Sequence, residues 1–371
     1  MRATRRYGSS LVVLVSLLVG GIATRAGAVA NSDRGASIVL FAKVVANLSE
    51  DTVIQITNTT NRVANAHCFY VKGLGTCSAT ASPCLHDADC SAAPQPQTCI
   101  DRWQTIDFNI LVTAQQPTVW RVSTGRPTNP ADSLTGLDPG NVPALSTPFA
   151  GELKCIETDV SGLPISGNSL IGLATIKNVN LQDLASYNAV GLRGFDTNDG
   201  DDVLCLGGGP SATCPNGAEY EGCPEQLILN HEADGATDQV VGPGSVVTTA
   251  ITLVPCSQDF EAQTPATAAV IFRAVNEFED VFSASTTFTC WDNLALGSIS
   301  PIFTVGSLLT DFAQTRISAV ANGPGVIAVA QEFHQIGGPI SLSASAAFNL
   351  HTDGTRTGSD LIVLPPVPPG P

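Results

Sequence analysis

The chain has 371 residues and a formal net charge of −16, from 17 basic and 33 acidic residues. This acidic balance argues against functions that need a basic surface, namely nucleic-acid binding and attachment to anionic lipid. Charged residues make up only 13 % of the chain, against a typical share of about 25 %. A composition low in charge and rich in small polar residues, Gly and Pro is typical of extracellular β-proteins.

The N-terminal segment predicts a cleavable secretory signal peptide. Three arginines come first, residues 11–23 form an apolar run, and Ala28 and Ala30 fit a small-residue cleavage site. The apolar run is too short for a membrane helix, which needs roughly 20 apolar residues. We therefore expect export to the extracellular space, the cell surface or the periplasm. The mature chain would begin near Val29 or Asn31 and would not insert into a membrane.

The eleven cysteines agree with an oxidising destination. Their odd number leaves at least one thiol free or paired between chains. Four of them lie in a short polar stretch, which has almost no core of its own, so we expect two disulfides among these four. They are Cys77, Cys84, Cys90 and Cys99. The same stretch is rich enough in Cys and His to suggest zinc, but export favours disulfides.

Strand patterns predominate along the chain. Apolar residues alternate with other residues over 107–113, over 247–253 and most regularly over 341–350, and strict alternation predicts half-buried strands. Clusters of Gly, Pro, Asn and Asp separate these runs, as turns do in sandwiches. The one short helix that we expect lies within 180–186.

The two halves of the chain share an order of local features, which predicts a duplication. In each half a strand ending in Asn precedes a turn and a strand that ends in cysteine plus an aromatic residue. An aromatic–Asn pair, a loop and an Asp before a final apolar strand come later. The matched residues are Asn58 with Asn276, Cys68 with Cys290, Asn188 with Asn349, and Asp202 with Asp360. The alternative to a duplication is that any two β-domains share such a succession of strands and turns.

These patterns predict an all-β fold: two tandem immunoglobulin-like β-sandwiches with a disulfide-rich insert and linker. The expected boundaries are a signal peptide at 1–30, a first sandwich at 36–207 with a cysteine-rich insert at 74–101, a linker at 208–244, a second sandwich at 245–365 and a Pro-rich tail at 366–371.

The insert resembles the small cysteine-rich inserts of secreted bacterial proteins, through the segment CLHDADC at 84–90. The rest of the chain resembles uncharacterised secreted bacterial β-sandwich proteins. Neither resemblance implies an activity.

A run of oxygen-bearing side chains offers a candidate calcium site, because hard cations bind several oxygens at once. The candidate ligands are Asp196, Asn198, Asp199, Asp201 and Asp202. The spacing is not that of an EF-hand. The alternative is a solvated turn, since Asp, Asn and Gly are common turn residues.

No nucleophile elbow, phosphate-binding loop or metal-ligand pair of histidines is present in the sequence. Glu277 and Glu279 form an acidic patch that suggests paired catalytic carboxylates, but its place after a strand-ending Asn favours a solvated hairpin. We therefore expect a secreted or surface protein that works by structure or binding, without catalytic activity or a required cofactor, on a protein or glycan at the cell surface. The alternatives are a secreted hydrolase acting on carbohydrate and a calcium-stabilised adhesion module.

Overall fold

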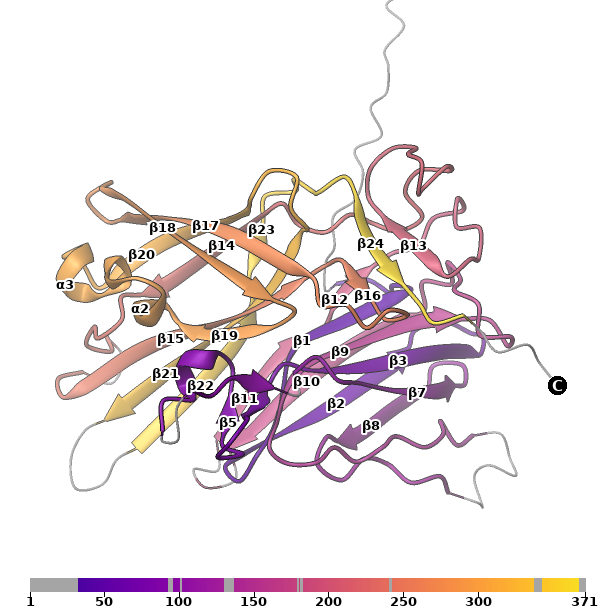
Figure 1. Cartoon of the computed structure of the whole chain (residues 1–371), viewed down its shortest axis with the longest axis horizontal. Helices are drawn as coiled ribbons and strands as arrows, with labels where there is room; N and C mark the ends of the chain where they lie inside the picture. Colours follow the sequence, from indigo (N-terminus) through magenta and orange to yellow (C-terminus); the bar gives the residue numbers. More distant parts are fainter. Residues whose placement is uncertain are drawn as a thin grey trace, which may run out of the picture.

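The computed structural model is all-β, with 53 % of its residues in strands and 5 % in helices, which confirms the predicted class (Figure 1). Helices in the described residues are single turns: η1 (Asp87–Asp89), α2 (Leu296–Ile299), η2 (Pro301–Phe303) and α3 (Val305–Leu308). The structure describes residues 33–92, 96–100, 102–129, 137–178, 180, 183–239, 242–336 and 342–366. The signal peptide expected at 1–30, and all but the first residue of the expected tail, lie outside these residues.

Nine strands of the first half form two layers. One has the order β7-β3-β9-β1-β12 and the other β8-β2-β10-β11, and the single pair Ala46 with Asp51 links them through β1 and β2. The layers face each other: Trp120 Nε1 on β8 donates a hydrogen bond to Tyr70 Oη on β3, at 2.7 Å. The bounds are β1 (Ile38–Ala46), β2 (Glu50–Asn58), β3 (Ala64–Lys72), β7 (Thr105–Val112), β8 (Pro117–Arg121), β9 (Phe149–Thr158), β10 (Leu170–Asn178), β11 (Asp183–Asn188) and β12 (Val190–Leu192).

Nine strands of the second half form a five-stranded sheet, β18-β17-β20-β14-β23, and a four-stranded sheet, β19-β15-β21-β22. Phe272 of the first sheet and Ile251 and Ala330 of the second belong to one buried core. The bounds are β14 (Gln226–Glu232), β15 (Ser245–Pro255), β17 (Thr267–Asn276), β18 (Val281–Thr289), β19 (Asp292–Ala295), β20 (Phe312–Ala319), β21 (Val326–Ile336), β22 (Leu342–Asn349) and β23 (His351–Thr352).

The strand order of the first set recurs in the second. Counted along the chain within each set, strand one pairs with strands six and nine, and strand three pairs with strands four and six. In the other layer strand two pairs with strands five and seven, and strand seven pairs with strand eight. The correspondence therefore runs from β1 and β14 to β12 and β23.

Two of the four residue matches expected from the sequence fall on non-corresponding strands. Asn58 ends the second strand of its set, whereas Asn276 ends the third. Cys68 lies in the third strand and Cys290 follows the fourth. The physical reason is local, because each Asn Oδ1 accepts a backbone N–H two residues on, at 2.9 and 3.0 Å. This turn chemistry recurs wherever a strand reverses.

The other two matches fall within or next to strands that hold the same place in the chain order of the two sets. Asn188 and Asn349 end β11 and β22. Asp202 precedes β13 (Val203–Leu206), and Asp360 begins β24 (Asp360–Val363). These two strands pair antiparallel with each other, and β16 (Gln258–Asp259) extends the sheet.

The segment 208–244, expected to be a linker, contains strand β14. Leu227, Leu229 and His231 alternate into the core, so QLILNHE is a half-buried strand that pairs with β20 and β23. The helix expected within 180–186 is wrong where the structure describes it, because Asp183 begins β11.

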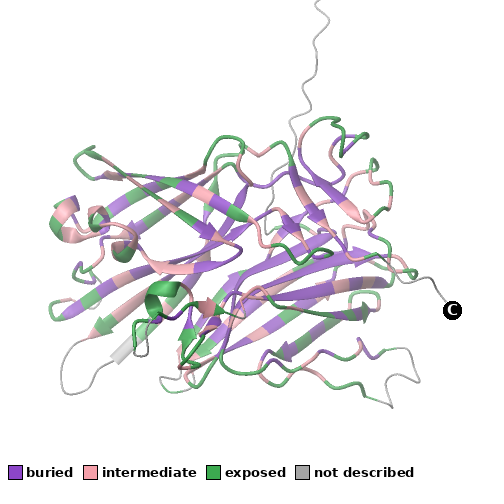
Figure 2. Ribbon diagram, viewed as in Figure 1, coloured by how far each residue is buried: buried purple, intermediate pink, exposed green. Residues whose placement is uncertain are grey.

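The two strand sets share a buried interface (Figure 2). All nine residues of β1 are buried, since one face meets the partner layer and the other meets the second half. Trp291 from the second half is buried there, and its Nε1 donates to the carbonyl oxygen of Ala42 at 2.7 Å. Such burial on both faces explains the continuous apolar run of β1.

Five disulfides form, and Cys290 remains a buried thiol, in agreement with the odd cysteine count. The insert strands β4 (Gly75–Cys77), β5 (Pro83–Cys84) and β6 (Cys99–Ile100) form a small separate sheet. The bonds join Cys68 to Cys155, Cys77 to Cys90, Cys84 to Cys99, Cys205 to Cys214, and Cys223 to Cys256.

Candidate functional site

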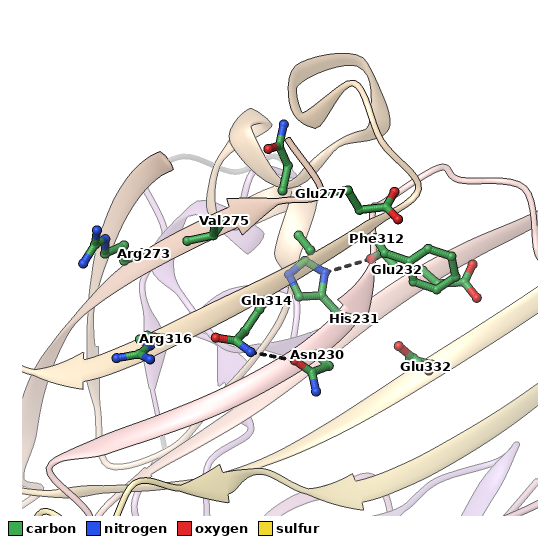
Figure 3. A pocket seen from close by; sticks show the side chains of 12 residues that line it. Asn230, His231, Glu232, Arg273, Val275, Glu277, Phe312, Gln314, Arg316 and Glu332 are labelled. Carbon is green, nitrogen blue, oxygen red and sulfur yellow. Dashed lines mark hydrogen bonds between the residues drawn. The ribbon is translucent and has the colours of Figure 1, made fainter. Parts of the chain in front are cut away.

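The outer face of the sheet β18-β17-β20-β14-β23 carries a cavity of about 760 Å³ (Figure 3). Strand alternation produces it, because Phe272, Thr315 and Leu229 point into the core while their neighbours point outward. Amide, guanidinium, carboxylate and aromatic groups line the cavity: Asn230, Gln314, Arg273, Arg316, Glu232, Glu277, Glu332 and Phe312.

Two arginines lie side by side at one end of this cavity. Arg273 on β17 and Arg316 on β20 are directly opposite in the ladder, and both are exposed. Arg316 Nη1 donates to Gln226 Oε1 at 3.4 Å. Neither guanidinium forms an ion pair with another described residue. Like charges opposite each other on a sheet destabilise it, so this pair favours a ligand that supplies negative charge or hydrogen-bond acceptors.

Carboxylates gather at the other end of the cavity. Glu232 is on β14, and Glu332 reaches it from β21 of the other sheet. Burial raises the pKa of Glu232, and the negative charges of Asp238 and Glu332 raise it further. Burial also raises the pKa of Glu332, although the backbone N–H of Glu232 and the imidazole of His334 oppose the shift. One oxygen of Glu232, Oε2, is buried without a hydrogen-bond partner among the described residues.

His231 contributes to the scaffold of this site. Its Nδ1 pairs with the carbonyl oxygen of Glu232 and its Nε2 with Thr315 Oγ1, both at 2.8 Å. Burial lowers the pKa of His231, which favours the neutral ring. Both ring nitrogens are therefore occupied, and the ring fixes β14 against β20.

Phe312 gives the cavity an apolar surface. It begins β20, is 41 % exposed, and lies beside Glu232 in Figure 3. The outward-facing residues of β20 thus place the polar side chains of Gln314 and Arg316 on the same face as the ring of Phe312.

The expected calcium ligands divide into two groups. Asp199 and Asp201 come together with Glu219, and one ligand oxygen of each lies within 4.8 Å of the others. The sequence did not point to Glu219, which is buried and far along the chain from the acidic run. Its Oε1 and Oε2 accept the backbone N–H groups of Asp199 and Cys205, at 3.1 and 2.9 Å.

The remaining candidate ligands serve the loop itself. Asn198 Oδ1 accepts the N–H of Gly200, and its Nδ2 donates to Tyr220 Oη at 2.6 Å. Asp196 is exposed, and Asp202 lines a second cavity of about 880 Å³. Asp199 and Asp201 each accept a backbone N–H two residues on, as turn residues do. Calcium binding at this loop stays a prediction.

The expected hairpin around Glu277 and Glu279 is confirmed. Asn276 Oδ1 accepts the N–H groups of Phe278 and Asp280, at 3.0 and 2.8 Å, and closes the turn between β17 and β18. Both glutamates are exposed, although Glu277 reaches the rim of the cavity.

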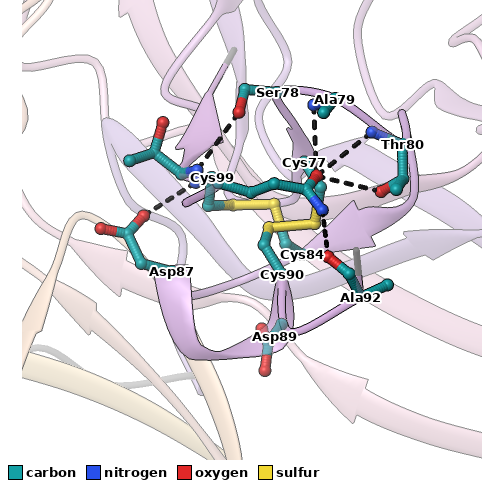
Figure 4. Close-up of a disulfide and its surroundings, with 12 residues drawn as sticks. Cys77, Ser78, Ala79, Thr80, Cys84, Asp87, Asp89, Cys90, Ala92 and Cys99 are labelled. Carbon is teal, nitrogen blue, oxygen red and sulfur yellow. Dashed lines mark hydrogen bonds between the residues drawn. A yellow bond between two sulfur atoms is a disulfide. The ribbon is translucent and has the colours of Figure 1, made fainter. Parts of the chain in front are cut away.

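The cysteine-rich insert is cross-linked by two disulfides (Figure 4). The two predicted bonds among its four cysteines are confirmed. Asp87 Oδ1 accepts the N–H of Cys99 at 2.7 Å, and Asp89 Oδ2 accepts that of Leu85 at the same distance. His86 Nε2 lies 3.0 Å from Asp292 Oδ2, so the insert also contacts the second half of the chain.

No protein-family model and no curated protein sequence matches this chain. The functional inference therefore depends on the site itself. Within the described residues, no helix is long and apolar enough to cross a membrane.

Proposed function

We propose that the chain is an exported glycan-binding protein without catalytic activity, built from two tandem immunoglobulin-like sandwiches. The ligand would lie on the outer face of the sheet β18-β17-β20-β14-β23. Five disulfides are compatible with an oxidising, extracellular destination. The apolar leader supports the same reading, as does the resemblance to secreted bacterial proteins.

The repeated strand order supports the tandem arrangement. In each set the first strand pairs with the sixth in one layer, while the second pairs with the seventh in the other. Strands B and E, and strands C and F, are related in this way in immunoglobulin sandwiches. One difference is that the Cys68–Cys155 disulfide joins neighbouring strands of one layer instead of crossing between layers. With β14 included, the second sandwich would begin near Gln226.

The pair Arg273 and Arg316 carries the proposed binding function. Two exposed guanidinium groups held in register on neighbouring strands are the geometry that hydrogen-bonds carboxylate or sulfate oxygens. Asn230 and Gln314 next to them offer amide donors and acceptors for hydroxyl groups, and Gln314 Nε2 donates to Asn230 Oδ1 at 3.3 Å. These groups suit a sugar chain that bears acidic groups.

Calorimetric titration with a uronic-acid oligosaccharide and with a neutral oligosaccharide of the same length tests the proposal. We expect binding of the acidic ligand, and a loss of roughly tenfold or more in affinity for Arg273→Ala combined with Arg316→Ala. The matched control, Arg62→Ala with Lys177→Ala, removes the same charge from exposed positions in the first half. Equal loss in both double variants would refute a site at the arginine pair.

Glu232 and Glu332 favour one second candidate, a carbohydrate hydrolase. Both carboxyl groups line the same cavity and have raised pKa values, as a general acid needs. Incubating the protein with the bound oligosaccharide and analysing its length separates the two functions. Intact ligand supports binding alone. Cleavage that Glu232→Gln and Glu332→Gln both abolish would establish the hydrolase.

The calcium-stabilised module remains a proposal with its own test. Calcium that binds only the folded chain would raise the free energy of unfolding by about 2.7 kcal/mol at a concentration one hundred times its dissociation constant. Thermal melts in calcium and in chelator measure this effect. If Asp199→Ala and Asp201→Ala leave both melts unchanged, only the turn role remains.

A further inference from the structure

A buried polar cluster lies away from the cavity, where the two strand sets meet. Glu152 and Lys154 stand two residues apart on β9, so their side chains leave the same face, and neither residue is exposed. Lys154 Nζ donates to both carboxylate oxygens of Glu152, at 2.8 and 2.9 Å. Gln258 on β16 places its side-chain carbonyl oxygen Oε1 against the same Nζ. An amine, a carboxylate and a carboxamide are thus gathered away from water.

The surroundings of this cluster are apolar and fix the carboxamide. The ring of Phe260 lies 6.0 Å from Lys154 Nζ and stacks on Phe69, with ring centroids 4.2 Å apart. Gln258 Nε2 points to the buried thiol of Cys290, 3.6 Å from Sγ. The carbonyl oxygen therefore faces the amine and the amide nitrogen lies near the thiol, while the Gln258 side chain also hydrogen-bonds the carboxyl group of Glu152.

As a simple ion pair the cluster is a poor source of stability. Taking two charges out of water costs several kcal/mol per ion, and replacing a buried pair by apolar residues is often neutral or stabilising. Burial raises the pKa of Glu152, although the adjacent Lys154 opposes the shift. A carboxylate so placed readily accepts a proton from its neighbour.

We propose that Lys154 and Gln258 form an intramolecular isopeptide bond, with Glu152 as the catalytic proton carrier. Glu152 takes a proton from the Lys154 ammonium, and the freed lone pair of Nζ attacks Cδ of Gln258. The carboxyl of Glu152 then returns the proton to Nε2 as the Cδ–Nε2 bond breaks. The Glu152 carboxylate then takes the second proton from Nζ and passes it to the released ammonia, which leaves as ammonium. One N–C bond forms and one breaks, and no oxidant or reductant is needed.

The reacting atoms, Lys154 Nζ and Gln258 Cδ, lie close together in the folded chain. A carbonyl bond is about 1.23 Å long, so an amine in contact with Oε1 lies within about 4 Å of Cδ. Reacting atoms at about 3 to 3.5 Å define a near-attack geometry, which a small side-chain movement reaches. Water exclusion strengthens the electrostatic interactions within the cluster and limits competing hydrolysis.

The bond would join the two halves of the chain in a way that reduction does not undo. Lys154 lies in β9, a central strand of the first set. Gln258 comes shortly after β15 of the second set, two residues after Cys256, which is bonded to Cys223. This inference is independent of glycan binding, because none of its residues lines the cavity on β14, β17 and β20.

The intact mass of the reduced, denatured full-length mature chain tests the proposal. We expect a mass lower than the sequence mass by one ammonia molecule, and a digest in which a peptide containing Lys154 remains joined to one containing Gln258. The full sequence mass would overturn the proposal. A deficit that hydroxylamine removes, with Gln258 linked to Cys290 as a thioester, would also overturn it.

A matched pair of variants tests the role of Glu152. Glu152→Gln keeps the size of the side chain but cannot carry the proton, so the chain should show its full sequence mass. Glu157→Gln changes another buried glutamate of β9, which accepts from Ser169 Oγ at 2.6 Å, and should keep the cross-link. Cross-linked Glu152→Gln protein would contradict the assigned role, and the mass of the unmodified wild-type chain decides the bond even if a variant fails to fold.

Discussion

Asn188 and Asn349 hydrogen-bond each other reciprocally. The backbone N–H of Asn188 donates to Asn349 Oδ1 at 3.0 Å, and Asn349 Nδ2 donates to the carbonyl oxygen of Asn188 at 2.7 Å. They end β11 and β22, which occupy the same place in their strand sets and form the edges of the two four-stranded layers. Ser345 Oγ on β22 also donates to Asp183 Oδ2 on β11, at 2.7 Å. The two edges therefore cover each other, which protects both from pairing with another chain.

Replacing Asn349 with alanine should weaken this contact between the strand sets. Two hydrogen bonds are lost at a partly exposed position, so the free energy of unfolding should fall by about 1 kcal/mol. Denaturant unfolding measures the change. Gln335→Ala, at an exposed position on neighbouring β21, is the control and should change stability little. Equal effects of the two substitutions would mean that the reciprocal pair contributes nothing specific.

Lys43 should make stability depend on pH in the alkaline range. Its burial against the second half lowers its pKa to about 8, with the negative charge of Glu50 opposing the shift, and its Nζ donates to Asn293 Oδ1 at 3.0 Å. Between that value and the ordinary pKa of 10.5 the unfolded chain binds a proton that the folded chain does not. Stability from this group therefore rises with pH across that window, by up to about 3 kcal/mol.

The difference in unfolding free energy between the wild type and Lys43→Met isolates this effect, because the shifts of the buried tyrosines and Cys290 cancel in the comparison. The wild type should gain on the variant from pH 8 upward. A difference that stays constant over this range would show that Lys43 keeps its ordinary pKa.

Gly73→Ala should disturb the packing of the Trp291 side chain. A methyl group on Gly73 would lie 2.5 Å from the indole ring, and that ring is fixed by its hydrogen bond to Ala42. Overpacking of this kind typically costs about 1–3 kcal/mol. Thermal melting measures the loss against Gly209→Ala, where no atom lies within 4 Å of the added methyl. If both variants had the same melting temperature, the close packing of Gly73 against Trp291 would not matter for stability.

The cysteine-rich insert should be dispensable for folding. Thr76 and Ile100 pair across β4 and β6, so a two-glycine turn can join them once residues 77–99 are removed. The shortened chain should keep its β-sheet circular dichroism. The deletion also removes His86, which lies 3.0 Å from Asp292 and favours its ionised form, whereas burial raises the pKa of Asp292. The shortened chain should therefore lose more stability at neutral pH, where Asp292 is ionised, than in acid, where it is protonated. Failure of the shortened chain to fold would make the insert a structural core element.

How far the sequence predicted the fold depends on what each residue contacts. Alternation over 107–113 identified β7, because Phe108, Ile110 and Val112 face one core. The two disulfides of the insert could be predicted because a short polar loop without a core needs cross-links. β1 gave no alternating signal, since both of its faces are buried, and its second covering layer comes from the distant half of the chain.

The candidate site was less predictable for the same reason. Arg273 and Arg316 become neighbours only through the pairing of β17 with β20. Glu332 reaches Glu232 from the other sheet, and Glu219 meets Asp199 across a loop. Asn58 and Asn276 do not mark equivalent strands, because the same local turn chemistry occurs at different places in the strand order.

Hydrogen exchange of the mature protein, with and without the uronic-acid oligosaccharide, tests glycan binding most directly. We expect slower exchange confined to β14, β17 and β20, including the backbone around Arg273 and Arg316, and no such change in the double arginine variant. Protection on the first strand set, or no protection at ligand concentrations that saturate binding, would contradict it.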